Sequence, residues 1–132
     1  MKAKELLAVS AALMGEKNDT DSGYDLQLFE ENAPRLINVL LQECFELDCS
    51  LKQLNPEGFN YAASSIDSLE DELDMHESIV KGVLPFGLCY LFLINEDMQR
   101  AQEFKSRYLK NKERLKNSRS RGKRHGTVDV YR

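Results

Sequence analysis

The chain has 132 residues, of which 42% are hydrophobic and 30% are charged, and its formal net charge is −4. This length and composition are typical of one globular domain that can bury a core without disulfides or metals. The most apolar stretch, residues 83–94, is too short to span a bilayer, and no signal peptide is recognisable near the N-terminus. We therefore expect a soluble protein that makes no contact with membranes.

The charges are sorted along the chain. Residues 1–104 carry 7 Lys and Arg against 20 Asp and Glu, whereas residues 105–132 carry 11 against 2. Such a distribution is typical of a compact acidic domain followed by a basic arm that contacts something else. We place the domain at residues 1–116 and the basic, flexible arm at residues 117–132.

Three cysteines, Cys44, Cys49 and Cys89, lie within apolar or helical patterns and not in pairs of the CxxC type. Their odd number and their surroundings indicate free, buried thiols in an intracellular protein. We do not expect a disulfide or a zinc site.

The first half of the chain predicts two helical segments. Apolar residues cluster over residues 3–14, and Gly15 ends that segment. Over residues 24–54 apolar side chains recur every three or four positions, which is typical of a helix with one buried face. Pro34 interrupts this pattern, so we expect a kink or a restart near Asn32, with helix on both sides.

The second half predicts two longer helices. Residues 55–60 form a loop, and residues 65–73 are ambiguous, with a short helical turn as one option. Asp74 is a plausible cap for a helix over residues 75–93, which should bend or pack closely around Gly82, Pro85 and Gly87. Asn95 is the candidate cap of the last helix, which should run to about residue 116 with its apolar seam at Ala101, Phe104, Tyr108 and Leu115.

Beyond that helix the pattern changes twice. Residues 118–126 contain no apolar side chain and should not fold unaided. Residues 127–131 then alternate polar with apolar types, which is typical of a short strand. The sequence therefore predicts an all-α fold, a four- to five-helix up-and-down bundle with an extended C-terminal arm that ends in a short β segment.

The chain offers little catalytic chemistry. It contains no glycine-rich phosphate loop and neither a GxSxG nor an HExxH motif. Asp74, His76 and Glu77 could share a helix face and bind a metal, but the other histidine lies in the arm. A solvated or partner-facing acidic surface is the better interpretation. We expect no enzymatic activity, no metal and no cofactor.

The basic arm allows three interpretations. It could be a solvated tail, or its cations could neutralise nucleic-acid phosphates without reading sequence. Alternatively, residues 127–131 could add a strand to a partner's sheet, with the basic linker steering the arm toward an acidic surface. The terminal alternation favours this last interpretation. The candidate residues of the arm are Arg119, Arg121, Lys123, Arg124, Thr127, Val128, Val130, Tyr131 and Arg132.

One segment resembles a known family. The run LPFGLCYLFLINED over residues 84–97 and the downstream Ala101, Phe104 and Tyr108 are similar to motifs in head–tail connector (adaptor, neck) proteins of tailed bacteriophages. The stretches RLINVLLQE over residues 35–43 and IDSLED over residues 66–71 add to this resemblance, which covers residues from about 24 to 115.

The resemblance implies a non-enzymatic virion protein located in the neck region, and in the host cytoplasm during assembly. Its partners would be the portal protein, tail-side connector proteins and further copies of itself in a ring, typically a dodecamer. Genomic DNA would pass through without sequence-specific contact, and the acidic body would keep it from sticking. The arm would dock on the portal. The alternative is an intracellular nucleic-acid-binding or regulatory helical module that uses its basic tail.

The charge separation also suggests how ring neighbours could pair. Basic residues of the last helix would face acidic residues before the third helix, in a heterologous interface that closes by rotation. The candidates are Lys105, Arg107, Lys112 and Arg114 on one side and Glu70, Asp71 and Glu72 on the other.

Overall fold

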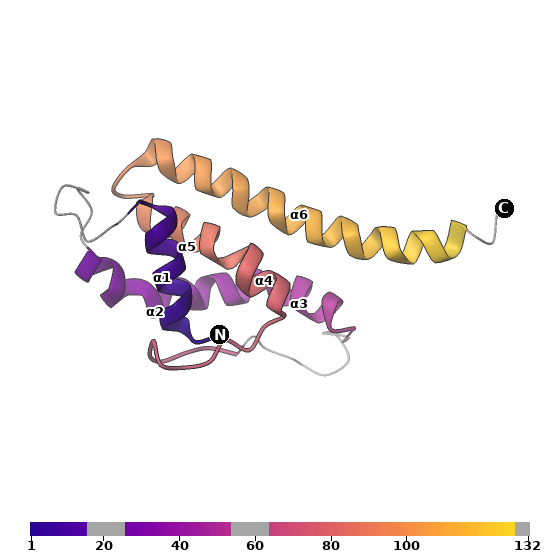
Figure 1. Cartoon of the computed structure of the whole chain (residues 1–132), viewed down its shortest axis with the longest axis horizontal. Helices are drawn as coiled ribbons and strands as arrows, with labels where there is room; N and C mark the ends of the chain where they lie inside the picture. The colour runs from indigo at the N-terminus through magenta and orange to yellow at the C-terminus, as the bar shows by residue number, and fades with distance from the viewer. Residues whose placement is uncertain (16–25, 54–63, 129–132) are drawn as a thin grey trace.

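The computed structural model describes the backbone of residues 1–15, 26–53 and 64–128, and the side chains of the same ranges except Leu26 and residues 119–128. This part of the chain is all-α, as the sequence predicts, and its ordered elements are helices (Figure 1). The helices are α1 (Ala3–Leu13), α2 (Leu26–Glu43), α3 (Phe45–Leu51), α4 (Glu77–Gly82), α5 (Leu84–Leu93) and α6 (Met98–Val128).

Helix α5 lies at the centre of the molecule. It contacts α1, α2, α4 and α6, and seven of its ten residues are buried. An apolar helix this short gains little stability from its backbone alone and depends on burial against its neighbours. In Figure 1 the helix α1 runs across the direction of α2 and α6, so α5 is covered from more than one side.

The first long helical segment breaks at a different residue from the one we expected. Helix α2 runs through Pro34 without a restart near Asn32, whose side-chain amide donates to the carbonyl of Leu28. The interruption lies at Cys44 instead, between α2 and α3. Cys44 is bonded to both helices, since its N–H donates to the Leu40 carbonyl and its carbonyl accepts from the Asp48 N–H.

The second long segment is two helices and not one. Helix α4 ends at Gly82 and α5 begins at Leu84, with Val83 between them. Pro85 stands at the start of α5, where its missing N–H costs nothing, so the expected bend is a full helix boundary. The cap of α4 is His76 and not Asp74, since the His76 Nδ1 atom accepts a hydrogen bond from the Ser78 N–H.

Helix α6 starts later and ends later than predicted. Asp97, not Asn95, accepts a side-chain bond from the Arg100 N–H at its start. The helix then continues to Val128, so residues 117–128 extend it and do not form an irregular linker. Its apolar seam ends at Leu115, which is why the sequence pattern stops there. Thr127 and Val128 are helical, and residues 129–132 of the predicted β segment lie outside the described residues.

Backbone hydrogen bonds join the N-terminal segment to the turn at residues 65–73, which precedes α4. Backbone N–H groups of Ala3, Lys4 and Leu73 bond to carbonyls across this junction, and Lys2 and Glu72 form an isolated antiparallel bridge. Within the turn, the Ser68 Oγ atom accepts from the Glu70 N–H. Residues 65–73 are therefore a turn held by the N-terminal segment, and they contain no helix.

Candidate functional site

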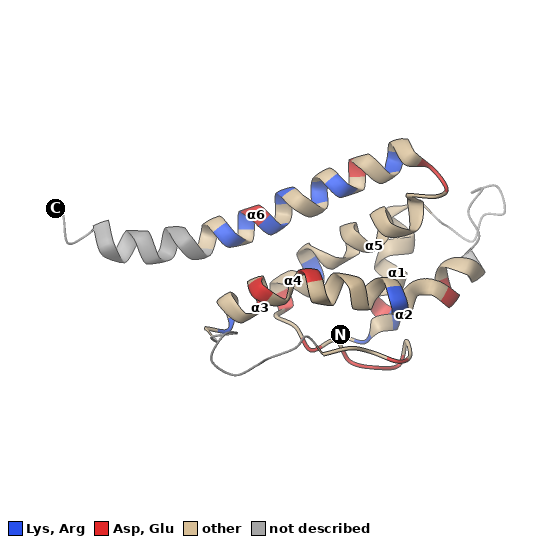
Figure 2. Cartoon of the chain, turned by 180° about the vertical axis from the view of Figure 1, so that it is seen from behind, with Lys and Arg blue, Asp and Glu red and all other residues tan. Residues whose placement is uncertain are grey.

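The C-terminal half of α6 extends beyond the helices against which it packs (Figures 1 and 2). In the first half of α6, the inner face of the helix packs on the core through the buried side chains of Ala101, Phe104 and Tyr108. In addition, the Asn111 Nδ2 atom donates to the Gly82 carbonyl at 2.9 Å. The orientation of α6 on α5 is therefore set as far as Leu115, and cations occupy both of its outer sides.

Several of these cations lie over aromatic rings of the same chain. The guanidinium of Arg107 lies 6.0 Å from the centroid of the Phe86 ring, and Lys105 Nζ lies 5.5 Å from that of Tyr90. Lys112 Nζ lies 5.1 Å from the ring of Tyr108 and donates to the carbonyl of Glu43. Contacts of this kind contribute about 0.5–1 kcal/mol at exposed sites, so they orient the cations without burying them.

The acidic candidates Glu70, Asp71 and Glu72 are brought together but are engaged within the subunit. Glu70 pairs with Lys2 and Lys4, and Glu72 pairs with the N-terminal ammonium at 3.1 Å. Hydrogen bonds from Lys4 lower the pKa of Glu70, and hydrogen bonds from the Asp67 and Ser68 N–H groups lower that of Asp71. Within the subunit, this turn forms no ion pair with the described cations of α6. Its carboxylates pair with Lys2, Lys4 and the N-terminal ammonium.

A groove of about 500 Å³ separates α3 from the extended part of α6. Leu47 of α3 and Leu109 of α6 give it an apolar floor, and Leu109 is 50% exposed. Charged and polar side chains form the rim: Glu43, Glu46, Ser50, Lys112, Glu113 and Lys116. A surface that combines an apolar floor with charges of both signs is suited to a protein partner.

Glu43, which lines this groove, also takes part in a partly buried polar contact. The hydroxyl of Tyr108 donates to Glu43 Oε1 at 2.7 Å and lies 3.6 Å from the Sγ atom of Cys44. Burial is the main cause that raises the pKa of the Tyr108 phenol, and the nearby Cys44 and Glu43 add to it. The phenol therefore stays protonated and acts as a hydrogen-bond donor.

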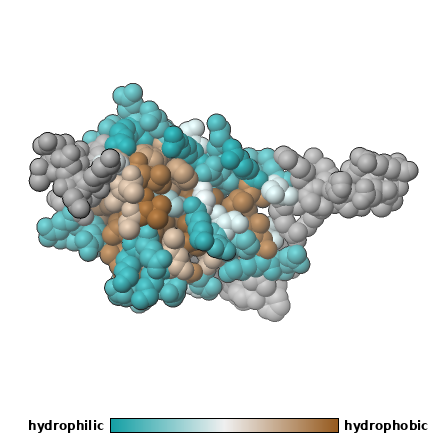
Figure 3. Space-filling view, in the orientation of Figure 1, coloured by the Kyte–Doolittle hydropathy of each residue, from teal (hydrophilic) through white to brown (hydrophobic). Residues whose placement is uncertain are grey.

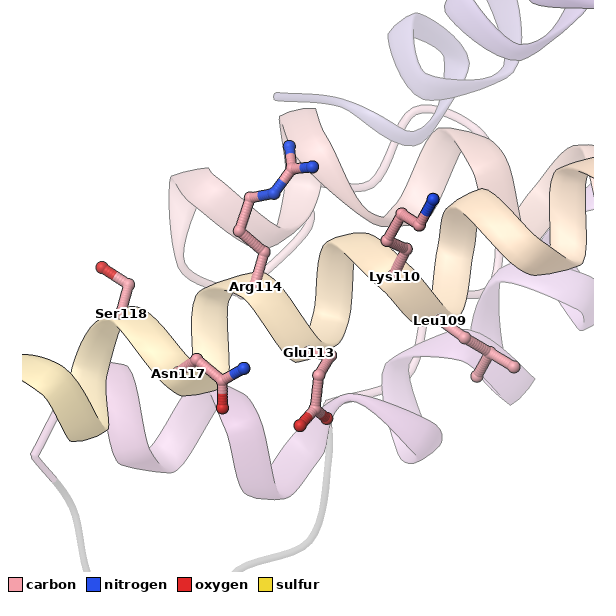
Figure 4. A pocket seen from close by; sticks show the side chains of 6 residues that line it. All are labelled: Leu109, Lys110, Glu113, Arg114, Asn117 and Ser118. Carbon is pink, nitrogen blue, oxygen red and sulfur yellow. The ribbon is translucent and has the colours of Figure 1, made fainter.

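A second hollow, of about 810 Å³, runs along α6 itself. Figure 4 shows that Lys110, Arg114 and Ser118 point to one side of the helix, whereas Leu109 and Glu113 point to the other. Arg107, Lys110 and Arg114 are exposed and form no ion pair with any residue whose side chain the structure describes. These three cations are therefore available to an anionic partner, as is Lys116 at the groove.

An exposed apolar face on α1 was missed by the sequence analysis. Val9 and Leu13 are 40% and 37% exposed, and the neighbouring Ala8 and Ala12 are exposed as well. Figure 3 shows apolar atoms gathered on the side of the molecule where α1 lies. The composition of α1 indicates this face, because α1 is apolar on more sides than a helix with a single buried stripe requires.

The residues once considered for a metal have other partners. His76 caps α4, Glu77 pairs with Lys81, and Asp74 pairs with Lys52 and accepts from the Ser64 hydroxyl. Over the described ranges, no group of three or more His, Cys, Asp or Glu could hold a metal ion. Within the same ranges, no helix has the length and the apolar character needed to cross a membrane.

The arm residues are described only in part. The backbone of Arg119, Arg121, Lys123, Arg124, Thr127 and Val128 belongs to α6, while Val130, Tyr131 and Arg132 lie outside the described residues. Comparison with known proteins finds no matching family, no matching curated protein and no matching solved structure.

Proposed function

We propose that this chain is a non-enzymatic structural adaptor of a tailed-phage virion, a head–tail connector that assembles as a ring between portal and tail. The observation that carries the proposal is the extension of the α6 backbone beyond the body of the subunit (Figure 1). A charged helix that projects past its own core is an element suited to reaching another molecule.

The motif behind the family resemblance supports the fold that the proposal requires. Gly87 lies so close to Tyr108 that a Cβ atom added to it would stand 2.8 Å from the ring. The two halves of the motif, on α5 and α6, are therefore a single packing unit that fixes the direction in which α6 projects. The up-and-down bundle that we expect for the helices of each subunit also belongs to this proposal.

Ring formation requires two different surfaces that fit each other on neighbouring subunits. The exposed apolar face of α1 and the groove between α3 and α6 meet this requirement. Helix α1 packs on α2 and α5, while α3 packs on α2 and α6, so the two surfaces belong to different sides of the subunit. In this arrangement Val9 and Leu13 of one subunit contact Leu47 and Leu109 of the next.

The charges around these surfaces fit the same arrangement. Glu5 is exposed one turn before Val9, and Lys112 and Lys116 stand on the rim of the groove. The pairing expected between the cations of α6 and the turn at residues 70–72 of a neighbour stays a prediction, and it would compete with the ion pairs that this turn forms with its own N-terminal segment.

The C-terminal end of α6, with Arg119, Arg121, Lys123 and Arg124, would dock on the portal. Docking as a helix needs no rearrangement. Docking by strand addition through Thr127, Val128, Val130 and Tyr131 requires the last turn of α6 to unwind, which makes that mode more costly than an already extended arm.

The test is the mass of the assembly in solution, measured by native mass spectrometry for the full chain alone and with a candidate portal protein. We expect a ring of many copies on the portal. The variants Val9→Lys and Leu109→Lys should lose this assembly while remaining folded. Val39→Lys is the matched control, since Val39 is 46% exposed and lies outside both surfaces. A wild-type chain that stays monomeric with the portal present would refute the adaptor.

A further inference from the structure

The row of unpaired cations along α6 has a composition that differs from that of the groove on the other side of the helix. Arg107, Lys110 and Arg114 follow one another by three and four residues, so they share one face of the helix. We propose that this row, here called the α6 ridge, binds the phosphate backbone of double-stranded nucleic acid without reading its sequence.

The first argument is the set of side chains on this face. Ser118 is exposed and points to the same side of the helix as Lys110 and Arg114, whereas Asn117 points away with Glu113 (Figure 4). Glu103, one turn before Arg107, is the exposed carboxylate on the ridge side of the described helix. Arginine, lysine, serine and asparagine are the side chains that proteins use to contact phosphate oxygens. A docking site for an acidic protein would instead need apolar or aromatic side chains at its centre. Leu109 lines the same hollow as Lys110 and Arg114 but points to the other side of the helix (Figure 4).

The second argument is that the cations are available and are held in place. Glu103 precedes Arg107 by one turn, but the described side chains show no ion pair between them. Glu113 lines the same hollow as Lys110 and Arg114, but its side chain points away from theirs (Figure 4) and forms no ion pair with a described side chain. The Phe86 ring supports Arg107 from below, and the bond from Asn111 to Gly82 stops α6 from rotating about its axis.

The third argument concerns length. At about 1.5 Å per residue, the row from Arg107 to Arg114 is about 10 Å long. One strand of a duplex presents a phosphate every ~3.4 Å along the axis, so the row can meet about three phosphates. Arg121 follows Arg114 by two further turns on the same helix backbone, so the basic sequence continues beyond the described side chains.

A duplex suits this surface better than a single strand. Binding of single strands uses exposed aromatic rings on which bases stack. The two rings nearest the ridge, Phe86 and Tyr90, are only partly exposed and lie under the cations of Arg107 and Lys105. The inference does not depend on the adaptor proposal, because it can be tested on the isolated full chain.

The experiment measures binding of the full chain to a fluorescent 25-base-pair duplex of arbitrary sequence, by anisotropy, at several salt concentrations. The variant Arg107→Gln/Lys110→Gln/Arg114→Gln removes the ridge and keeps good helix formers at all three positions. The control Lys2→Gln/Lys4→Gln/Lys81→Gln removes three cations that pair with carboxylates elsewhere on the subunit. Both variants change the net charge equally, and circular dichroism checks their folding.

We expect wild-type binding that weakens steeply with salt. In the ridge variant, affinity should fall at least tenfold at low salt, and the slope of log K against log[salt] should decrease by about 2–3. The control should retain wild-type affinity and slope. A sequence-unrelated duplex should bind equally well, and polyglutamate at the same charge concentration should compete poorly.

Three results would overturn the assignment. The first is an absence of duplex binding at low salt by the wild-type chain. The second is an equal loss in both variants, or no loss in the ridge variant, which would assign binding to net charge or to residues beyond 118. The third is displacement of the duplex by polyglutamate at equal charge, which would identify a general surface for acidic polymers.

Discussion

The Tyr108 hydroxyl on α6 donates a 2.7 Å hydrogen bond to the carboxylate of Glu43 at the end of α2. The tyrosine side chain is 3% exposed, so this bond ties two helices at the border between the core and the groove. Lys112 lies over the same ring and bonds to the Glu43 carbonyl. One aromatic side chain thereby positions the rim of the groove as well as the packing beneath it.

The first prediction concerns this hydrogen bond. Tyr108→Phe should lower the free energy of unfolding by about 1–2 kcal/mol, because Glu43 loses a buried donor while the ring still fills its site. The melting temperature measured by circular dichroism should fall by several degrees. Tyr90→Phe, at a half-buried tyrosine of α5, is the control and should have little effect. Equal losses of unfolding free energy in the two variants would show that the hydrogen bond from Tyr108 to Glu43 does not stabilise the fold.

The second prediction concerns the close approach of α5 and α6. A Cβ atom on Gly87 would stand 2.7 Å from Leu40 Cδ2 and 2.8 Å from the Tyr108 ring. Gly87→Ala should therefore destabilise the protein by about 1–3 kcal/mol through overpacking. Gly82→Ala is the matched control, since a Cβ there meets nothing within 4 Å. It should be neutral or slightly stabilising in urea unfolding, because alanine favours helix.

The third prediction concerns Asp48, a carboxylate that is only 5% exposed. It accepts from the His76 N–H at 2.7 Å and pairs with Lys52 Nζ at 3.1 Å, so it joins α3 to the start of α4. Although burial of Lys52 acts to lower its pKa, the bonds to Asp48 and Asp74 outweigh that effect and raise it.

Asp48→Ala should cost about 2–3 kcal/mol in urea unfolding, because it leaves the buried His76 amide and Lys52 without this partner. The comparison is Asp74→Ala, whose carboxylate is 73% exposed and also pairs with Lys52. That change should cost less than about 1 kcal/mol. A larger loss of unfolding free energy in Asp74→Ala than in Asp48→Ala would contradict the role assigned to Asp48.

The fourth prediction concerns acid. The folded-state pKa of Asp71 is lowered from its ordinary value of 3.8, chiefly by the N–H groups of Asp67 and Ser68, and Lys4 lowers that of Glu70 from 4.5. A lowered folded-state pKa gives stability that is complete above the ordinary value and is lost as the pH falls through the folded value. The melting temperature should therefore decline below about pH 4.5. Asp71→Asn should make this decline less steep. An unchanged dependence of the melting temperature on pH in this variant would contradict the role assigned to Asp71.

The fifth prediction concerns the cysteines. All three are buried, and burial is the main cause that raises their pKa values, to about 12 for Cys89. The thiolate is the reactive form, so the folded protein should react slowly with maleimide at neutral pH. Addition of urea should speed labelling along the unfolding curve. Rapid labelling of any of the three in the native protein would contradict this burial.

The types of most elements could be predicted from the sequence, because apolar spacing reports directly on which helix face is buried. Gly15 ends α1 with a positive φ of 79°, as its position after an apolar run indicated. The boundary at Cys44 could not be predicted, since Pro34 is the stronger local signal and tertiary packing carries α2 through it. The length of α6 could not be predicted either, because its apolar seam stops at Leu115 while its helical backbone continues to Val128.

The candidate site was predicted less well, because its partners are far apart in sequence. The cations of α6 were recognised, but their positions over Phe86 and Tyr90 depend on how α5 and α6 pack. Acidic residues around Glu70 predict an available acidic surface. Its neutralisation by Lys2 and Lys4 joins residues more than 60 positions apart, and no local pattern reports such a contact.

The proportions of α6 have a mechanical consequence. At about 1.5 Å per residue, this helix of 31 residues is about 46 Å long, and its described side chains pack on the core as far as Leu115. The residues that follow Leu115, up to Val128, add about 20 Å, so a tilt of about 5° at Leu115 would move the end of the helix by about 2 Å. A small change in the packing of Leu115 would therefore change the position of the basic end, and a single subunit could meet targets set at different distances.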